Sequence, residues 1–195
     1  MPKHRSRAEF EKMIFPHFAK AYNLARWLLR NPQDAEDAVQ ISYMKAFKAF
    51  DQLSGNELSS HQCTSWLLQI IRNTCLTILK KNANRAEIIH LDTVKDILEH
   101  QYHDETVTNI QNIPETEMLV QSTQQAVWKA IEQLPLDHRE IIVLREFEDL
   151  SYRQIADITG VPVGTVMSRL SRARKQLCEL LLPYLSEEEE QHNEL

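Results

Sequence analysis

Residues Leu150–Leu177 read LSYRQIADITGVPVGTVMSRLSRARKQL and contain two amphipathic segments separated by a short turn. Ser151 and Gln154 have the spacing of a capping box, in which the two side chains each bond a free backbone N–H at the start of a helix. Gly160 suits the left-handed position that ends a helix, and Pro162 suits the first turn of the next one. The stretch therefore predicts a helix-turn-helix.

The second of these helices has two unlike faces. Its apolar seam falls within an arc of about 60° and consists of Val166, Leu170, Ala173 and Leu177. The opposite face carries cations and hydroxyls but no carboxylate, and consists of Met167, Ser168, Ser171, Arg172, Arg174 and Lys175, with Arg169 at its edge. Because phosphates line the major groove and its base edges offer acceptors, we expect this face to bind duplex DNA.

Helical patterns also fill the first half of the chain. Asn31 and Pro32 fit an N-cap followed by a first-turn proline, which would open a helix that runs to about Phe50. Its expected inward stripe consists of Ala35, Val39, Tyr43, Ala46, Phe47 and Phe50. Residues 51–62 indicate a loop, and residues 65–81 a third helix. That helix is expected to bury Trp66, Ile70 and Ile78 and to expose Gln69, Arg72, Asn73, Thr77 and Lys80.

Two further capping boxes are predicted, at Ser6–Glu9 and at Asp137–Glu140. The second has Leu136 and Ile141 in the positions of a hydrophobic staple. With 43% hydrophobic residues and three glycines in 195 positions, the chain suits an all-α fold with real cores. We expect two small helical domains, the second containing the helix-turn-helix.

Charge is segregated along the chain, and it helps to divide the chain into domains. Residues 1–85 carry 13 Lys and Arg against 7 Asp and Glu, whereas residues 86–150 carry 4 against 14. Residues 151–178 are again basic, and residues 179–195 contain six Glu and no cation. Charge blocks of this kind indicate partners better than the net charge of −6 does. The predicted parts are a first domain at 1–85, a flexible acidic linker at 86–117, a second domain at 118–185 and an acidic tail at 186–195.

Three segments together resemble a known family. The string LPLDHREIIVLREFEDLSYRQIADITGVPVGTVMSRLSRARKQL, at 134–177, is similar to the fourth conserved region of bacterial sigma factors of the sigma-70 family, extracytoplasmic-function (ECF) group. The strings DAEDAVQISYMKAF, at 34–47, and SWLLQIIRNTCL, at 65–76, resemble the second conserved region. The resemblance implies a cytoplasmic, non-enzymatic protein that binds core RNA polymerase, recognises promoter DNA at the −35 and −10 elements, helps to open the duplex, and is held by an anti-sigma factor.

The resemblance also implies roles for individual residues. Residues at positions where the family contacts the −35 element are Thr165, Ser168, Ser171 and Arg172, with Arg169 and Arg174 near phosphates. Asn73 lies where the family approaches an unstacked −10 base, beside the loop at 51–62. Residues at the family's polymerase-docking positions are Asp34, Asp37 and Gln40. Two residues depart from the family pattern: Met167 replaces a common arginine, and Ile41 stands where an acidic residue often follows the glutamine.

Residue chemistry fits the roles at the −10 element. An asparagine side chain offers both a donor and an acceptor, so Asn73 can read the edge of an unstacked base. The cations expected to hold the displaced strand are Arg72, Lys80, Lys81 and Arg85. On spacing alone, Asn73 would be an ordinary surface residue, and Trp66 and Phe47 fit a core better than a stacking platform for bases.

Other classes of function remain as alternatives or are excluded. A stand-alone helix-turn-helix regulator and a pure protein-interaction module are the two alternatives. No phosphate-binding glycine loop, H-E-x-x-H motif or activated nucleophile indicates an enzyme, and no cofactor is expected. His100 and His103 could ligate a metal if helical, but an acidic linker suits them better, and we expect no metal site. The three cysteines lack paired spacing, and no segment is long enough for a membrane span.

Overall fold

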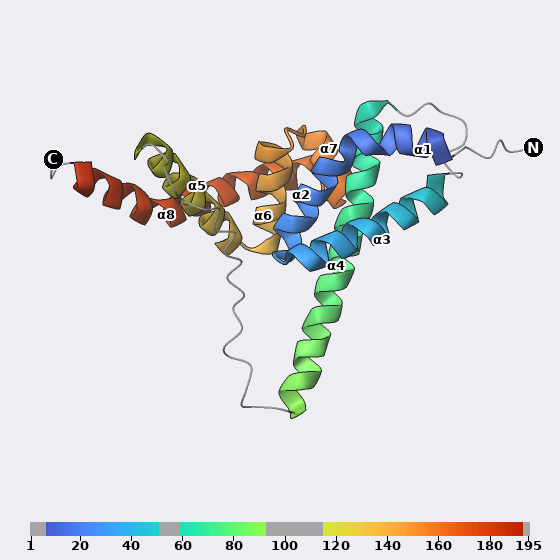
Figure 1. The fold of residues 1–195 in the computed structure, drawn as a ribbon, viewed down its shortest axis with the longest axis horizontal. Helices are drawn as coiled ribbons and strands as arrows, with labels where there is room; N and C mark the ends of the chain where they lie inside the picture. Colours follow the sequence, from blue (N-terminus) through green and yellow to red (C-terminus); the bar gives the residue numbers. More distant parts are fainter. Residues whose placement is uncertain (1–6, 51–58, 93–114, 193–195) are drawn as a thin grey trace, which may run out of the picture.

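The computed structural model of the protein describes residues 7–50, 59–92 and 115–192, and all of its regular structure is helical. In the first half of the chain the elements are α1 (Arg7–Ile14), η1 (Phe15–His17), α2 (Phe18–Leu29), α3 (Pro32–Phe50) and α4 (Ser60–Asp92). In the second half they are α5 (Glu115–Gln133), α6 (Leu136–Ile142), η3 (Val143–Phe147), α7 (Tyr152–Thr159) and α8 (Val163–His192). The end of α4 projects away from the helical body (Figure 1).

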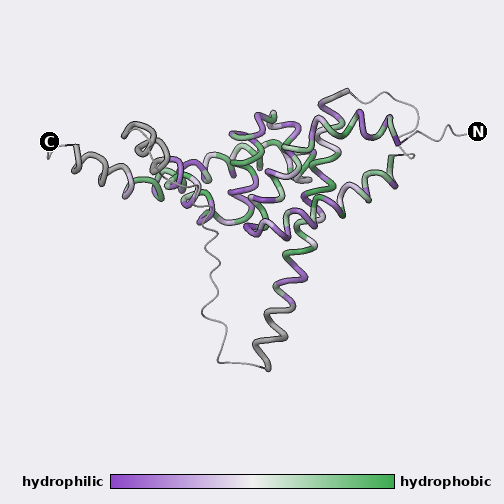
Figure 2. Tube along the Cα trace, viewed as in Figure 1, coloured by the Kyte–Doolittle hydropathy of each residue, from purple (hydrophilic) through white to green (hydrophobic). Residues whose placement is uncertain are grey.

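The first domain is built from α1 to α4. Asn31 Oδ1 accepts the backbone N–H of Asp34 at 2.9 Å, which confirms the predicted cap of α3. Helices α2, α3 and α4 pack against one another. Their core consists of residues of near-zero exposure, among them Leu24, Leu28, Ala35, Ala46, Leu67, Leu68 and Ile71. Hydrophobic residues gather where the helices cross (Figure 2).

The second domain contains the predicted helix-turn-helix. Ser151 and Gln154 form the complete capping box at the start of α7, and Gly160 ends that helix in the left-handed conformation with φ of 73°. Pro162 precedes α8 and accepts the backbone N–H groups of Thr165 and Val166. The apolar seam of α8 packs on α6 and α7, and three of its four members are buried: Val166, Leu170 and Ala173.

Several predictions about helix ends and faces were wrong. Helix α6 begins at Leu136 without a side-chain cap, so Asp137 and Glu140 form no capping box there. Helix α4 begins at Ser60, earlier than predicted, because Ser59 and Gln62 form a reciprocal cap before it. Phe47 belongs to the exposed side of α3 rather than its core, and its side chain is 46% exposed. The predicted cap at Ser6–Glu9 lies partly outside the described residues. Of the predicted loop at 51–62, residues 51–58 lie outside them and residues 60–62 belong to α4.

The face of α4 that packs inward is also offset from the prediction. The residues expected to be buried, Trp66, Ile70 and Ile78, are only partly buried. The fully buried positions are their neighbours Leu67, Leu68, Ile71 and Cys75. The helix packs against α2 and α3 on one side and α7 on another, so its buried surface is broader than one apolar stripe.

The two domains are in contact. Helix α2 lies against α6, and α4 lies against α7, so elements far apart in the sequence share one interface (Figure 1). Arg139 lies in this interface and is 4% exposed. Its guanidinium donates to the carbonyl of Trp27 in the first domain at 3.1 Å and to that of Leu134 in the second at 2.8 Å. Two helical domains therefore form one compact unit in this conformation.

Replacement of Ser151 by alanine should destabilise the second domain. The substitution removes the hydroxyl that accepts the Gln154 backbone N–H, so the free energy of unfolding should fall by about 1 kcal/mol. Urea denaturation followed by circular dichroism measures this loss. The matched control is Ser171→Ala, an exposed serine inside α8 that caps nothing, and equal loss in both variants would contradict the prediction.

Candidate nucleic-acid interface

The surface of α8 opposite its buried seam is open to solvent. Five side chains there are exposed, Met167 (53%), Ser168, Ser171, Arg172 and Lys175, while Thr165 is half-buried. We call these six residues the α8 face. Thr165 begins the face in the first turn, where its carbonyl accepts the Ser168 hydroxyl at 3.1 Å. The face follows from the seam, because a helix that buries one stripe must present the opposite one.

Cations beside the α8 face are held by carboxylates of the same domain. Arg174 Nη2 lies 2.6 Å from Glu146 Oε1, and this hydrogen bond raises the pKa of Arg174 above its usual value. Arg169 Nε lies 3.7 Å from Asp137 Oδ2. Arg172 forms no ion pair with any described residue; its Nε donates to the Ser168 carbonyl at 3.3 Å. The other cation of the face, Lys175, has its Nζ 4.0 Å from Glu179 Oε1. Arg172 is therefore the cation of the face whose charge no described carboxylate compensates.

Helix α4 carries the residues predicted for the −10 element. Asn73 is exposed, and its main-chain carbonyl accepts the Thr77 hydroxyl one turn later at 2.8 Å. Lys80 and Lys81 are exposed further along the same helix, while the side chain of Arg85 lies outside the described residues. The helix thus presents an amide followed by two cations.

Arg72 differs from the other predicted −10 residues because it is engaged by the second domain. Its Nε lies 2.5 Å from Glu140 Oε1 and its Nη2 lies 3.2 Å from Glu140 Oε2, so the pair is bidentate. The side chain of Arg72 is 17% exposed and that of Glu140 is 4% exposed. Burial raises the pKa of Glu140, and the contact with Arg72 only partly opposes this. The ion pair explains why Glu140 does not cap α6.

Helix α3 carries both polar and apolar side chains along one exposed stripe. Asp37 and Gln40 are exposed, and Asp34 is half-buried, with its Oδ2 accepting the Asn82 side-chain amide of α4 at 3.3 Å. The stripe continues at helical spacing through two apolar side chains, Ile41 (40% exposed) and Met44 (63% exposed). The predicted polymerase-docking residues therefore lie on one surface, next to exposed apolar side chains.

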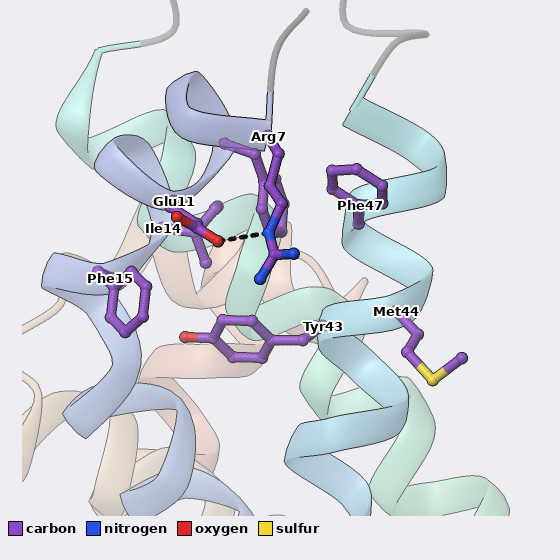
Figure 3. A pocket seen from close by; sticks show the side chains of 8 residues that line it. Arg7, Glu11, Ile14, Phe15, Tyr43, Met44 and Phe47 are labelled. Carbon is purple, nitrogen blue, oxygen red and sulfur yellow. Dashed lines mark hydrogen bonds and ion pairs between the residues drawn. The ribbon is translucent and has the colours of Figure 1, made fainter.

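An apolar groove extends this stripe. A cavity of about 400 Å³ lies between α1 and α3, and Phe15, Tyr43, Met44 and Phe47 border it (Figure 3). Burial raises the pKa of Tyr43 to about 12. At its rim, Arg7 Nε is 2.7 Å from Glu11 Oε1. The groove could not be predicted from the sequence, because it depends on how α1 packs beside α3.

The described residues offer little for metal or membrane chemistry. They contain no group of three or more His, Cys, Asp or Glu side chains that could hold a metal ion. His100 and His103 lie outside the described part of the chain. No described helix is both long enough and apolar enough to cross a bilayer.

Comparison with known proteins identifies the family. The models of sigma-70 region 2 and of sigma-70, region 4 match residues 16–85 and 124–177. The RNA polymerase sigma-H factor of Pseudomonas aeruginosa is 33% identical over 178 residues, which cover 91% of this chain and 89% of that protein. The chain belongs to the sigma-70 family. The ECF RNA polymerase sigma-E factor of Salmonella typhimurium is 36% identical over 152 residues, which cover 78% of this chain and 76% of that protein.

Solved structures agree with this assignment. The sigma factor RpoE of Bartonella quintana, in complex with the anti-sigma factor NepR, aligns with a TM-score of 0.64 and 28% identity over 89% of this chain and 96% of that one. CnrH, in complex with the cytosolic domain of CnrY, aligns with a TM-score of 0.60 and 20% identity. The alignment covers 90% of this chain and 89% of CnrH, and the two share the fold. The protein is an ECF sigma factor, a non-enzymatic factor that directs RNA polymerase in promoter recognition.

Proposed function

We propose that this sigma factor acts in the cytoplasm through three surfaces. The α8 face reads the −35 element, and α4 holds the opened −10 strand. Helix α3 docks on core RNA polymerase. The observation that carries the proposal is the exposed, carboxylate-free α8 face on a helix whose other side is buried. Transcription in vitro with core polymerase over a library of genomic fragments tests it. The absence of any promoter-specific transcript would contradict it.

At the −35 element, Arg172 is the best candidate for reading a base edge. An arginine can donate two hydrogen bonds to the O6 and N7 of guanine. Arg174 and Arg169 lie at the sides of the face, where phosphates would replace their carboxylate partners. Met167 adds an apolar contact, which in the major groove suits the methyl group of thymine.

At the −10 element, the exposed amide of Asn73 supports a role in base capture. A flipped base must have its edge hydrogen-bonded, and an amide can both donate and accept. Lys80 and Lys81, about two turns further along α4, would follow the backbone of the same strand. Arg72 is placed to join them once Glu140 has released it.

Polymerase docking is assigned to the stripe on α3 and the adjoining groove. Asp37 and Gln40 supply polar contacts, Ile41 stands where the family often has an acidic residue, and Met44 adds exposed apolar surface. Exposed apolar patches that polar residues border mark protein interaction sites. Because the RpoE structure holds the anti-sigma factor NepR, we also assign this chain an anti-sigma partner.

Replacement of Arg172 by alanine should lower promoter-dependent transcription while core binding stays intact. Loss of a bidentate base contact removes about 1–3 kcal/mol of DNA-binding free energy, or roughly one to two orders of magnitude in affinity. Transcription in vitro and a pull-down with core polymerase separate the two effects. Lys129→Ala, an exposed cation on α5, is the control, and an equal loss of core binding in Arg172→Ala would refute the assignment.

Replacement of Asn73 by alanine should impair strand opening more than closed-complex formation. The variant loses the groups that would bond the base edge, at a loss of roughly tenfold in the population of open complexes. Permanganate footprinting reports unpaired thymines, and a gel shift at low temperature reports the closed complex. Thr77→Ala, one turn away, should open normally, and an unchanged footprint in Asn73→Ala would count against this role.

Replacement of Met44 by glutamate should weaken binding to core polymerase roughly tenfold, because a charge enters an apolar contact. Fluorescence anisotropy of the labelled sigma factor titrated with core enzyme measures the affinity. The matched control is Met167→Glu, the same change at another exposed methionine, on the α8 face. Equal affinities of the two variants for core polymerase would place docking elsewhere.

A further inference from the structure

The interface between the domains combines aromatic and polar contacts. Trp27 of α2 stacks on Trp128 of α5 with ring centroids 4.4 Å apart and planes 17° from parallel. The ring of Phe147 lies 5.4 Å from that of Trp27 on another side. Trp27 is 5% exposed, so the second domain covers much of an aromatic side chain that belongs to the first. Such contacts indicate a specific interface.

Two carboxylates of the second domain are buried against cations of the first. Glu148, 4% exposed, lies 3.2 Å from Lys20 Nζ and also accepts the Asn23 amide at 3.3 Å. Glu140 forms the bidentate pair with Arg72. Buried ion pairs of this kind gain little net stability, because each charge loses its hydration, but removal of one partner is costly because the other charge is left buried and unpaired. The interface therefore depends on these two pairs being matched.

This interface covers part of the surface assigned to the −10 strand. Helix α7 packs along α4, where Gln69 donates its side-chain amide to the Asp157 carbonyl at 3.3 Å. Arg72 follows Gln69 by about one helical turn, and Asn73 is the next residue after Arg72. The second domain thus lies beside the residues that are to hold DNA.

We infer that the second domain docks on the DNA-holding side of α4 and competes there with the promoter strand, with Glu140 occupying on Arg72 the place of a DNA phosphate. This inference rests on the proposed role of Arg72 at the −10 strand. A bidentate arginine contact is formed equally well with a carboxylate and with a phosphate. Binding of single-stranded DNA to this site therefore requires the domains to separate.

The competition should raise the apparent dissociation constant for single-stranded DNA by a measurable factor. When the binding-competent form is a minor fraction of the molecules, the apparent dissociation constant rises by the inverse of that fraction. A closed population of about 90% would weaken strand binding about tenfold. Reversal of one charge in the Arg72–Glu140 pair should open the interface, and reversal of both should close it again.

The first experiment measures domain separation without DNA. Small-angle X-ray scattering of the free full-length chain should give a larger radius of gyration for Glu140→Arg than for the wild type, and the wild-type value again for the double exchange Arg72→Glu with Glu140→Arg. Trp128→Ala removes the stacking partner of Trp27 and should also expand the chain without changing a charge. Glu146→Gln, whose ion pair lies within the second domain, is the control.

Circular dichroism verifies that each variant keeps its helices. Unchanged radii in both Glu140→Arg and Trp128→Ala would overturn the inference. A double exchange that stays expanded would overturn the part played by the Arg72–Glu140 pair.

The second experiment measures competition, with fluorescein-labelled oligo-dT as the probe, because backbone contacts carry no sequence preference. Trp128→Ala should bind oligo-dT several-fold more tightly than the wild type, and adding Arg72→Ala to it should remove the gain. If Arg72→Ala has no effect in the opened chain, the proposed role of Arg72 at the strand fails. If Arg72 contributes to binding but opening gives no gain, the competition fails instead.

Discussion

The α8 face depends on the burial of the opposite side of the helix, the α8 seam, against α6 and α7. Val166, Leu170 and Ala173 are each at most 2% exposed, so α8 cannot rotate about its axis without exposing them. That constraint fixes which residues face solvent, and it puts Arg172 and Ser168 outside. The cap at Ser151 and the left-handed Gly160 set where α7 begins and ends, and hence the angle at which α8 leaves the turn. The proposed DNA-reading role of the α8 face would thus be a consequence of apolar packing.

The sequence predicts local features well where a few neighbouring residues decide them. The capping box at Ser151, the left-handed Gly160 and the cap at Asn31 all depend on residues within four positions of each other. The start of α4 could have been found in the same way, since Ser59 and Gln62 have the spacing of Ser151 and Gln154. The serines around it favoured a loop instead, so composition outweighed a valid capping signal.

Features that depend on distant partners could not be read from the sequence. Glu140 has the spacing of a capping residue, but its carboxylate meets Arg72, which is 68 positions away, and a charge-assisted bidentate pair outweighs a cap. Phe47 has helical spacing with the core of α3, yet it contacts Phe10 at the edge of the groove between α1 and α3. In both cases the local pattern is correct, and the tertiary neighbour decides the outcome.

The acidic residues of the second domain give the charge blocks of the sequence a physical meaning. The described carboxylates that contact cations of the proposed DNA-binding surfaces are Asp137, Glu140, Glu146 and Glu179. On the proposed assignment these carboxylates lie where phosphates would lie, so DNA binding would exchange one set of anions for another. Exposed pairs such as Arg174–Glu146 contribute little, and their exchange costs little.

The buried Arg72–Glu140 pair is different, because the domains must move before it can be exchanged. In the proposed scheme the α8 face, where Arg172 has no described carboxylate partner, would be available for DNA at once, whereas Arg72 of α4 would not. On these assignments burial would set the order of events at a promoter: the −35 element would bind first, and Arg72 would join the −10 strand only after the domains have parted.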